Sequence, residues 1–247
     1  MIVLLAPSES KVEGGDKSSL LNKDSLLFPL EYHKRLEITQ HYNQHINSCE
    51  DSALCQLFGI KDIKKAQNYK KDIFTLPTMK AIQRYTGVAF DYISYNELPT
   101  EAQEYIDKQT ILFSNLFGPI LAKDRIPNYK LKQGEKLEGI AIEAFYKKHF
   151  SALLENYLEN EDILDLRAGF YDKFYKPNKP YTTLKFLKEG KVVSHWAKAY
   201  RGIVLKALAL NNVQTLEDFE NLNIDGLKYV ETKTTKLKSE RIYTIIS

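Results

Sequence analysis

The stretch IVLLAPSESK at residues 2–11 decides how the fold begins. Its first five residues form a continuous apolar run, which is typical of a strand buried on both faces. The polar residues 7–19 that follow, with two adjacent glycines, predict a loop. Because α/β proteins place catalytic and phosphate-binding groups directly after such strands, Ser8, Glu9 and Lys11 are candidate site residues. The phosphate-loop pattern GxxxxGK[ST] is absent, so an ordinary polar turn stays open as the alternative.

Periodicity, capping residues and turn residues predict the other elements. Helices are expected over 30–47, 50–58, 61–70, 99–109, 138–159, 197–211 and 215–222. The segment 78–93 is expected to begin as a strand and to become helical after Gly87. Strands are also expected over 110–118, ending in a turn at Gly118-Pro119, over 162–168, in a hairpin at 182–196 and over 241–247, with loops at 119–136 and 169–181. Because helices and strands alternate without a regular βαβ rhythm, the sequence predicts a mixed α+β fold in one compact domain, residues 1–247.

The composition is that of a globular protein. The chain has 247 residues, 43% of them apolar and 27% charged, which is enough to bury a sizeable core. No apolar run approaches the roughly 18–20 residues that span a bilayer, and no basic region precedes the first apolar run as in a signal peptide. Cys49 and Cys55 have no common metal or redox spacing. We therefore expect a reduced, cytoplasmic protein that does not contact membranes.

The charge is concentrated in one segment although the whole chain carries only +3. Residues 167–206 contain ten Lys or Arg and two acidic residues, a local charge of +8. Eight aromatic residues are interleaved with these cations: Phe170, Tyr171, Phe174, Tyr175, Tyr181, Phe186, Trp196 and Tyr200. Cations neutralise phosphates and aromatic faces stack on bases, so the segment favours a nucleic-acid surface. The alternative is that the aromatics are core residues beneath a solvated face of lysines.

Two other kinds of site are weaker candidates. Five possible metal ligands recur every fourth residue in the predicted helix 30–47 and just after it: His33, Glu37, His41, His45 and Cys49. Each step of four residues advances about 40° beyond a full turn, so at most three of them converge on one face. A solvated polar face is the alternative, and we assign no metal. No GxSxG nucleophile motif occurs, and His195 has no acidic partner that the sequence reveals.

Five blocks of the sequence together resemble the YaaA family of peroxide-stress proteins over nearly the full chain. The blocks are LLAPSESK (4–11), IQRYTGVAFDYI (82–93), LFSNLFGPILAKDRIPNYKLKQGEKL (112–137), ILDLRAGFYDKFYKP (163–177) and VVSHWAKAYRG (192–202). The resemblance implies a bacterial protein that limits oxidative damage and is linked to lowering free intracellular iron. It also implies a single α+β body with a basic cleft for duplex or branched DNA, without a cofactor.

The resemblance further implies an element similar to a helix-hairpin-helix near the C-terminus. Its nearest match comprises the helices 197–211 and 215–222 and the turn NIDG at 223–226. This segment has only Gly226 in its turn and is acidic around it, whereas such hairpins hold phosphate on glycine-rich backbone. The basic segments 123–136 and 167–206 are therefore the expected DNA surface.

The leading hypothesis is a DNA-binding protein, expected to be a monomer, whose contacts are largely independent of base sequence. The expected phosphate-binding residues are Lys11, Arg84, Lys123, Arg125, Lys130, Lys132, Arg167, Lys173, Lys176, Lys198 and Arg201. The alternative is an enzyme that acts on a nucleic acid or nucleotide through the polar residues at strand ends, namely Ser8, Glu9, Asp165 and His195. Convergence of these residues around an unpaired carboxylate would favour the enzyme, whereas carboxylates fully paired with arginines would favour binding alone.

Overall fold

Strand β1 (Ile2–Leu5) lies inside the sheet, and all four of its residues are buried, as the apolar run predicts. It pairs in parallel with β3 (Thr110–Ser114) on one side and with β8 (Ile163–Asp165) on the other. The structure, a computed structural model, describes residues 1–246 except for the side chains of Ser194 and His195. The predicted fold class is confirmed, because these residues form one α+β domain around a mixed sheet.

The main sheet has the strand order β11-β12-β9-β8-β1-β3-β4, with β10 paired to β9. Its other strands are β4 (Gly118–Leu121), β9 (Tyr181–Lys188), β10 (Lys191–Val192), β11 (Leu227–Thr234) and β12 (Lys238–Ile245). Strands β12, β9, β8, β1 and β3 run in parallel, and β4, β10 and β11 pair antiparallel with their neighbours. The carboxyl ends of five strands therefore meet along one edge of the sheet.

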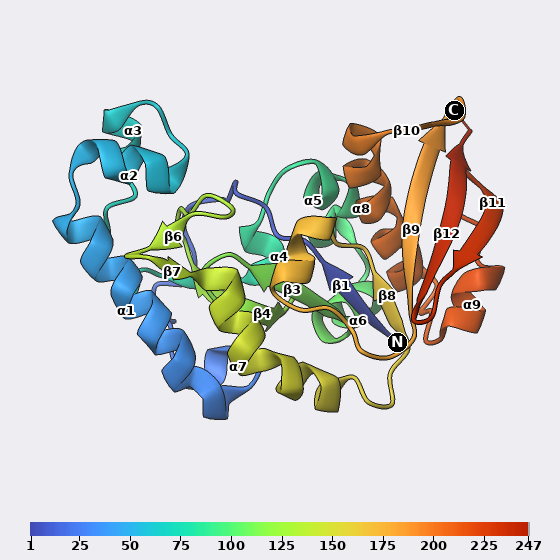
Figure 1. Cartoon of the computed structure of the whole chain (residues 1–247), viewed down its shortest axis with the longest axis horizontal. Helices are drawn as coiled ribbons and strands as arrows, with labels where there is room; N and C mark the ends of the chain where they lie inside the picture. The colour runs from blue at the N-terminus through green and yellow to red at the C-terminus, as the bar shows by residue number, and fades with distance from the viewer. Residues whose placement is uncertain (247) are drawn as a thin grey trace.

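Helices and short ribbons surround this sheet (Figure 1). The helices in the described chain are α1 (Tyr32–Ser48), α2 (Asp51–Phe58), α3 (Ile63–Gln67), α4 (Ala81–Arg84), α5 (Val88–Ile93), α6 (Thr100–Gln109), α7 (Ile142–Tyr157), α8 (Ser194–Leu210) and α9 (Leu216–Asn221). The short strands are β2 (Thr78–Lys80), β5 (Arg125–Pro127), β6 (Lys136–Leu137) and β7 (Ile140–Ala141), and the 3-10 turns are η1 (Lys23–Ser25), η2 (Pro29–Glu31), η3 (Tyr95–Glu97) and η4 (Gly169–Lys173). Figure 1 shows α2 and α3 at one end of the molecule and β9, β11 and β12 at the other.

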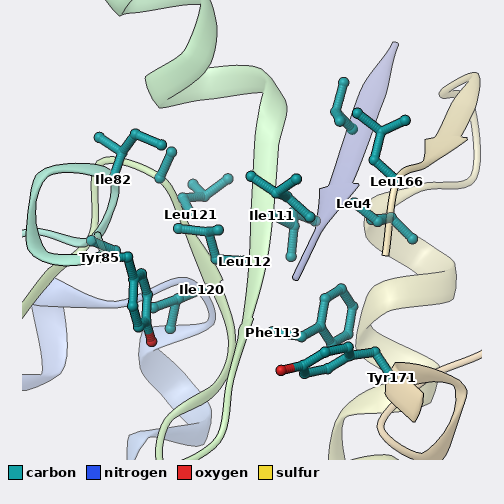
Figure 2. Close-up of a cluster of buried hydrophobic side chains, with 14 of the residues drawn as sticks. Leu4, Ile82, Tyr85, Ile111, Leu112, Phe113, Ile120, Leu121, Leu166 and Tyr171 are labelled. Carbon is teal, nitrogen blue, oxygen red and sulfur yellow. The ribbon is translucent and has the colours of Figure 1, made fainter. Parts of the chain in front are cut away.

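The core continues from the sheet into the flanking segments (Figure 2). Leu4 from β1, Ile111 from β3 and Leu166 after β8 are each at most 1% exposed. Their burial stabilises the packing of β1 between its two parallel neighbours. No helix within residues 1–246 is both long and apolar enough to cross a membrane.

Two sequence predictions about the elements are wrong, and one strand was not predicted. Gly118-Pro119 begins strand β4 instead of forming a turn, because the chain reverses earlier, between Ser114 and Gly118. The expected basic loop 119–136 contains β4, β5 and the start of β6, and its apolar residues enter the core. Strand β11 has no counterpart among the predicted elements, because seven of its eight residues are exposed and its apolar pattern is weak.

The aromatic residues of the basic segment are mostly core residues. Tyr171, Phe174, Tyr175, Tyr181, Phe186 and Tyr200 are all buried. Phe174 packs near Phe113 of β3, and Phe186 stacks on Tyr200 at 5.6 Å between ring centroids. Trp196, by contrast, is 41% exposed. The alternative of buried aromatics beneath cations is therefore confirmed for these six residues, and their rings are almost inaccessible for stacking.

Candidate functional site

A cavity of about 410 Å³ lies at the edge of the sheet where β1 and β8 end. Its walls come from the chain after β1, the start of α5, the loop before β6, the chain after β8, and α8. The lining residues that carry polar or charged side chains include Ser8, Glu9, Thr86, Gln133, Lys198 and Arg201. In sheets with parallel strands, ligands bind outside the carboxyl ends of the strands, so this position is typical of a functional site.

Close packing of α8 against α5 sets the cationic wall of the cavity. At Gly202 a Cβ atom would meet the carbonyl oxygen of Ala89, with the Ala89 carbonyl carbon at 3.0 Å and Tyr92 Cβ at 3.1 Å. Glycine is therefore required for the two helices to approach so closely. The preceding residue, Arg201, and Lys198 one turn earlier share this side of α8 and line the cavity.

Lys198 and Arg201 are cations without a carboxylate partner at this site. Among the described side chains, no Asp or Glu lies within ion-pair distance of either residue. Lys198 is exposed and Arg201 is partly buried. Burial lowers the pKa of the Arg201 guanidinium, and nearby Asp165 acts in the opposite direction. An anion bound between them would supply the missing counter-charge.

Glu9 is the exposed carboxylate that faces the same cavity. Its Oε1 accepts a hydrogen bond from the backbone N–H of Gln133 at 3.1 Å. Among the described residues it forms no ion pair. Neighbouring Ser8 accepts a hydrogen bond at Oγ from the backbone N–H of Ser10 at 3.1 Å. Among the described residues, the cavity is thus lined by one carboxylate and two cations that form no ion pair, and by the Ser8 hydroxyl group.

Asp165 and Arg167 form a closed ion pair next to this site. Asp165 Oδ1 accepts from Arg167 Nε at 2.9 Å, and Oδ2 accepts from Nη2 at 2.7 Å. Both residues are 6% exposed, and the guanidinium carbon lies 4.3 Å from the centroid of the Phe113 ring. Because each partner satisfies the other, this pair organises the chain after β8, and neither group is available to a ligand.

Lys11 and Arg84 lie inward from the surface. Arg84 is fully buried and donates to the carbonyls of Val12, Gly14, Pro77 and Ile126 at 2.7–3.3 Å. It therefore joins the loop after β1 to neighbouring segments and cannot meet DNA. The Lys11 ammonium lies over the ring of Tyr129, 3.9 Å from its centroid.

The predicted cations of residues 123–136 are divided between structural and surface positions. Arg125 pairs with Asp16 at 3.4 Å, and Lys132 pairs with Glu135 at 2.7 Å. Lys130 donates to the Glu9 carbonyl at 3.2 Å and therefore lies beside the cavity. Lys123 is exposed just after β4. Because Leu121 of β4 pairs with the amino end of β3, Lys123 lies toward the edge of the sheet opposite to the cavity.

The remaining predicted residues surround or miss the cavity. Lys173 and Lys176 are exposed after β8, and the Lys173 amine lies 4.9 Å from the centroid of the Phe170 ring. The side chain of His195 lies outside the described residues. Thr86 and Gln133 line the cavity but were not predicted as site residues. Both lie in sequence blocks that carry the family resemblance, and this resemblance was the feature that could have identified them.

The His and Cys stripe on α1 does not assemble a metal site in the described structure. Among the described side chains, no three His, Cys, Asp or Glu residues are placed to hold one ion. His41 instead lies 3.1 Å from Glu138, and Cys49 is the residue that ends α1. Of the stripe, His33 and Glu37 are exposed, whereas His41, His45 and Cys49 are partly buried.

The two predicted C-terminal helices are present as α8 and α9. They are joined by residues 211–215, and the turn NIDG at 223–226 leads into strand β11. Thr215 caps α9, and its acidic neighbours Glu217 and Asp218 lie in the first turn. Glu220 pairs with Arg241 at 2.7 Å. Contact between this element and DNA stays a prediction.

Comparison with known proteins identifies the family. The family model described as peroxide stress protein YaaA matches residues 1–233. A protein of Campylobacter jejuni is 45% identical over 246 residues, which is 100% of both chains. A UPF0246 protein of Corynebacterium glutamicum is 30% identical over 228 residues, 88% of this chain and 89% of its own. A UPF0246 protein of Streptomyces coelicolor is 28% identical over 216 residues, 84% of this chain and 82% of its own. The chain therefore belongs to the family of the peroxide stress protein YaaA.

Proposed function

We propose that the protein binds DNA at the edge of the sheet where the parallel strands end. The observation that supports this most strongly is the pair Lys198 and Arg201, two cations that line a cavity without a described carboxylate partner. Backbone phosphates are the anions that such a pair neutralises, and release of their counterions favours binding. Exposed Lys173 and Lys176 and the neighbouring Lys130 extend the positive surface around this point.

The proposed contacts are with the DNA backbone, so binding depends little on base sequence. The buried aromatics leave few rings for stacking on bases, which favours duplex or branched DNA over an extended single strand. We place the protein in the cytoplasm, where DNA is accessible, and we propose that it acts as a monomer.

Charge reversal tests this function. We expect Lys198→Glu with Arg201→Glu to weaken binding to a fluorescent duplex more than tenfold in an anisotropy titration, because two attractive contacts become repulsive. The matched control is Lys64→Glu with Lys65→Glu on α3, where both lysines are exposed and the charge change is the same. Figure 1 shows α3 far from α8. Equal affinity of the two double variants would contradict the proposal.

A second candidate function is an enzyme that acts on a nucleic acid or nucleotide in the same cavity. Glu9 supports it, because this carboxylate has no described ion-pair partner and faces the cavity together with Ser8 and Arg201. A carboxylate there is placed to act as a general base while the cations hold the substrate phosphate. Incubation with labelled duplex and junction DNA would reveal a changed product, and Glu9→Gln should abolish that change while binding stays intact. Unchanged DNA with the folded wild type would refute this candidate.

The peroxide-stress role of the family suggests what the proposed DNA binding does in the cell. We propose that bound protein shields DNA during peroxide exposure and that its presence is linked to lower free iron in the cell. A strain that lacks the protein should accumulate more DNA strand breaks and more chelatable iron after peroxide treatment. Complementation with the Lys198→Glu, Arg201→Glu variant should restore neither value if DNA binding underlies both.

A further inference from the structure

Lys11 is a half-buried lysine that forms no ion pair with any described side chain. Its Nζ donates to the Ser8 carbonyl at 3.4 Å and lies over the rings of Tyr129 and Tyr85, at 3.9 and 5.1 Å from their centroids. Among the described side chains, no carboxylate lies within ion-pair distance of it. A lysine in such a place is unusual, because buried ammonium groups are normally paired.

The tyrosines beside Lys11 cannot serve as its counter-ions. The Tyr85 hydroxyl lies 3.0 Å from that of Tyr129, which in turn lies 2.8 Å from Ser114 Oγ. Burial raises the pKa of both tyrosines, so both phenols remain neutral at physiological pH. They offer the amine ring faces and a polar chain of hydroxyl groups, but no negative charge.

The surroundings make the Lys11 ammonium ion less favourable than that of a lysine in water. Burial lowers the pKa of Lys11 well below its ordinary value, Lys130 lowers it further, Glu9 opposes this effect, and Arg84 adds to the lowering. A desolvated lysine beside other cations has a larger fraction of unprotonated amine and is therefore a better nucleophile. Arg84 is held in place by four carbonyls, so its charge is a fixed part of this environment.

The Lys11 amine lies behind one wall of the cavity, in contact with a residue that lines it. Ser8, to which it donates, lines the cavity, as do Thr86, which follows Tyr85, and Tyr171. An anionic ligand held by Lys198 and Arg201 would occupy this same space. The structure thus places a desolvated amine close to the proposed anion site.

We propose that Lys11 forms an imine with the aldehyde of an abasic site in bound DNA. The amine nitrogen attacks the aldehyde carbon and forms the C–N bond. A proton moves from nitrogen to the former carbonyl oxygen, and loss of water then gives the C=N bond. Radicals derived from peroxide leave aldehyde-bearing abasic sites in DNA, so this substrate suits a family named for peroxide stress. The inference rests on the proposed DNA binding.

Reductive trapping tests this inference. The full-length protein is incubated with a duplex that carries one abasic site, in the presence of sodium cyanoborohydride, and the product is separated on a denaturing gel. We expect one covalent adduct per chain, mapped by mass spectrometry to Lys11 in the wild-type protein. Lys11→Arg should reduce the adduct at least tenfold, whereas Lys64→Ala, at an exposed position on α3 away from the cavity, should retain it. No adduct above the level of an undamaged duplex, or an adduct unaffected by Lys11→Arg, would overturn the inference.

A second arm separates this inference from the proposed function. The same trapping with 2-deoxyribose 5-phosphate requires no DNA binding, and anisotropy measures DNA binding without any adduct. Labelling of Lys11 by the free sugar phosphate without DNA binding would support the reactive amine and overturn DNA as its substrate. Tight DNA binding without labelling of Lys11 by either aldehyde would overturn the inference and leave the proposed function intact.

Discussion

Replacing Asp165 by Asn should destabilise the protein strongly, because it removes one charge of a buried ion pair. The carboxylate accepts from Arg167 Nε at 2.9 Å, from Nη2 at 2.7 Å and from the Arg167 backbone N–H at 3.0 Å. Asparagine keeps the shape and one acceptor oxygen, but it places an amide NH₂ where the second oxygen was. The buried guanidinium group would then keep only the longer contact with the carboxylate of Asp172, at 3.9 Å, as a counter-charge.

Breaking a buried pair by removing one partner costs about 3–5 kcal/mol. We expect about 3 kcal/mol for Asp165→Asn, because one acceptor and the contact between Arg167 and the Phe113 ring remain. For a chain of this size, about 1 kcal/mol corresponds to roughly 2–4 °C, so the melting temperature should fall by roughly 10 °C.

Urea unfolding followed by circular dichroism measures this loss. The control is Asp165→Leu with Arg167→Met, which removes both charges and should cost less than the sum of the single changes. A free energy of unfolding for Asp165→Asn within about 0.5 kcal/mol of wild type would refute the structural role of the pair. Retained stability with loss of a nucleic-acid reaction would instead make Asp165 a residue of the second candidate function.

Three further predictions concern packing, titration and capping. Gly202→Ala should cost more than about 2 kcal/mol in thermal unfolding, because the new methyl group would collide with Ala89 of α5; a stability equal to wild type would contradict the close packing. Burial raises the pKa of Asp124 from 3.8 to about 6, so the folded state favours the protonated carboxyl group. The stability that this protonation contributes is fully present below pH 4 and is lost as the pH rises through 6. Between pH 4.5 and pH 8, the free energy of unfolding of Asp124→Asn should therefore rise by about 2 kcal/mol relative to that of wild type, as measured by urea unfolding. A difference between the two proteins that does not change with pH would refute the pKa shift. Thr215→Ala should cost about 1 kcal/mol in the same assay, since the Thr215 hydroxyl caps α9 by accepting from the Asp218 N–H at 3.0 Å; Thr215→Ser should not.

Local signals predicted most of the elements because their causes lie within a few residues. The apolar run at residues 2–6 predicts β1. Gly59, in a left-handed conformation, ends α2, and Thr215 caps the start of α9. The turn predicted at Gly118-Pro119 does not form, because contacts with residues distant in the sequence determine the structure there. Gly118 pairs with Ser114 and lies against the ring of Tyr146 from α7, a contact that sequence spacing does not reveal.

The candidate site was predicted only in part for a similar reason. Ser8, Glu9, Lys198 and Arg201 were predicted and do line one cavity. A cation on the surface and a cation buried against carbonyls look alike in a sequence, so Arg84 could not be recognised as structural. The difference depends on which segments fold over each side chain.

The basic segment shows the same limit for aromatic residues. Interleaved rings and cations are typical both of a nucleic-acid surface and of core residues alternating with solvated lysines. In this protein most of the rings are buried, and the exposed cations remain as the accessible chemistry. The proposed DNA contact therefore depends on charge, which makes salt the appropriate experimental variable.

The most direct test of the proposed DNA binding is the salt dependence of the affinity for duplex DNA. Each neutralised phosphate contributes about 0.9 to the slope of log K against log salt concentration. For Lys198→Gln with Arg201→Gln, we predict a slope shallower than that of wild type by about 2, while Lys64→Gln with Lys65→Gln leaves it unchanged. Identical slopes for wild type and the Lys198→Gln, Arg201→Gln variant would contradict the claim that DNA binds at this cavity.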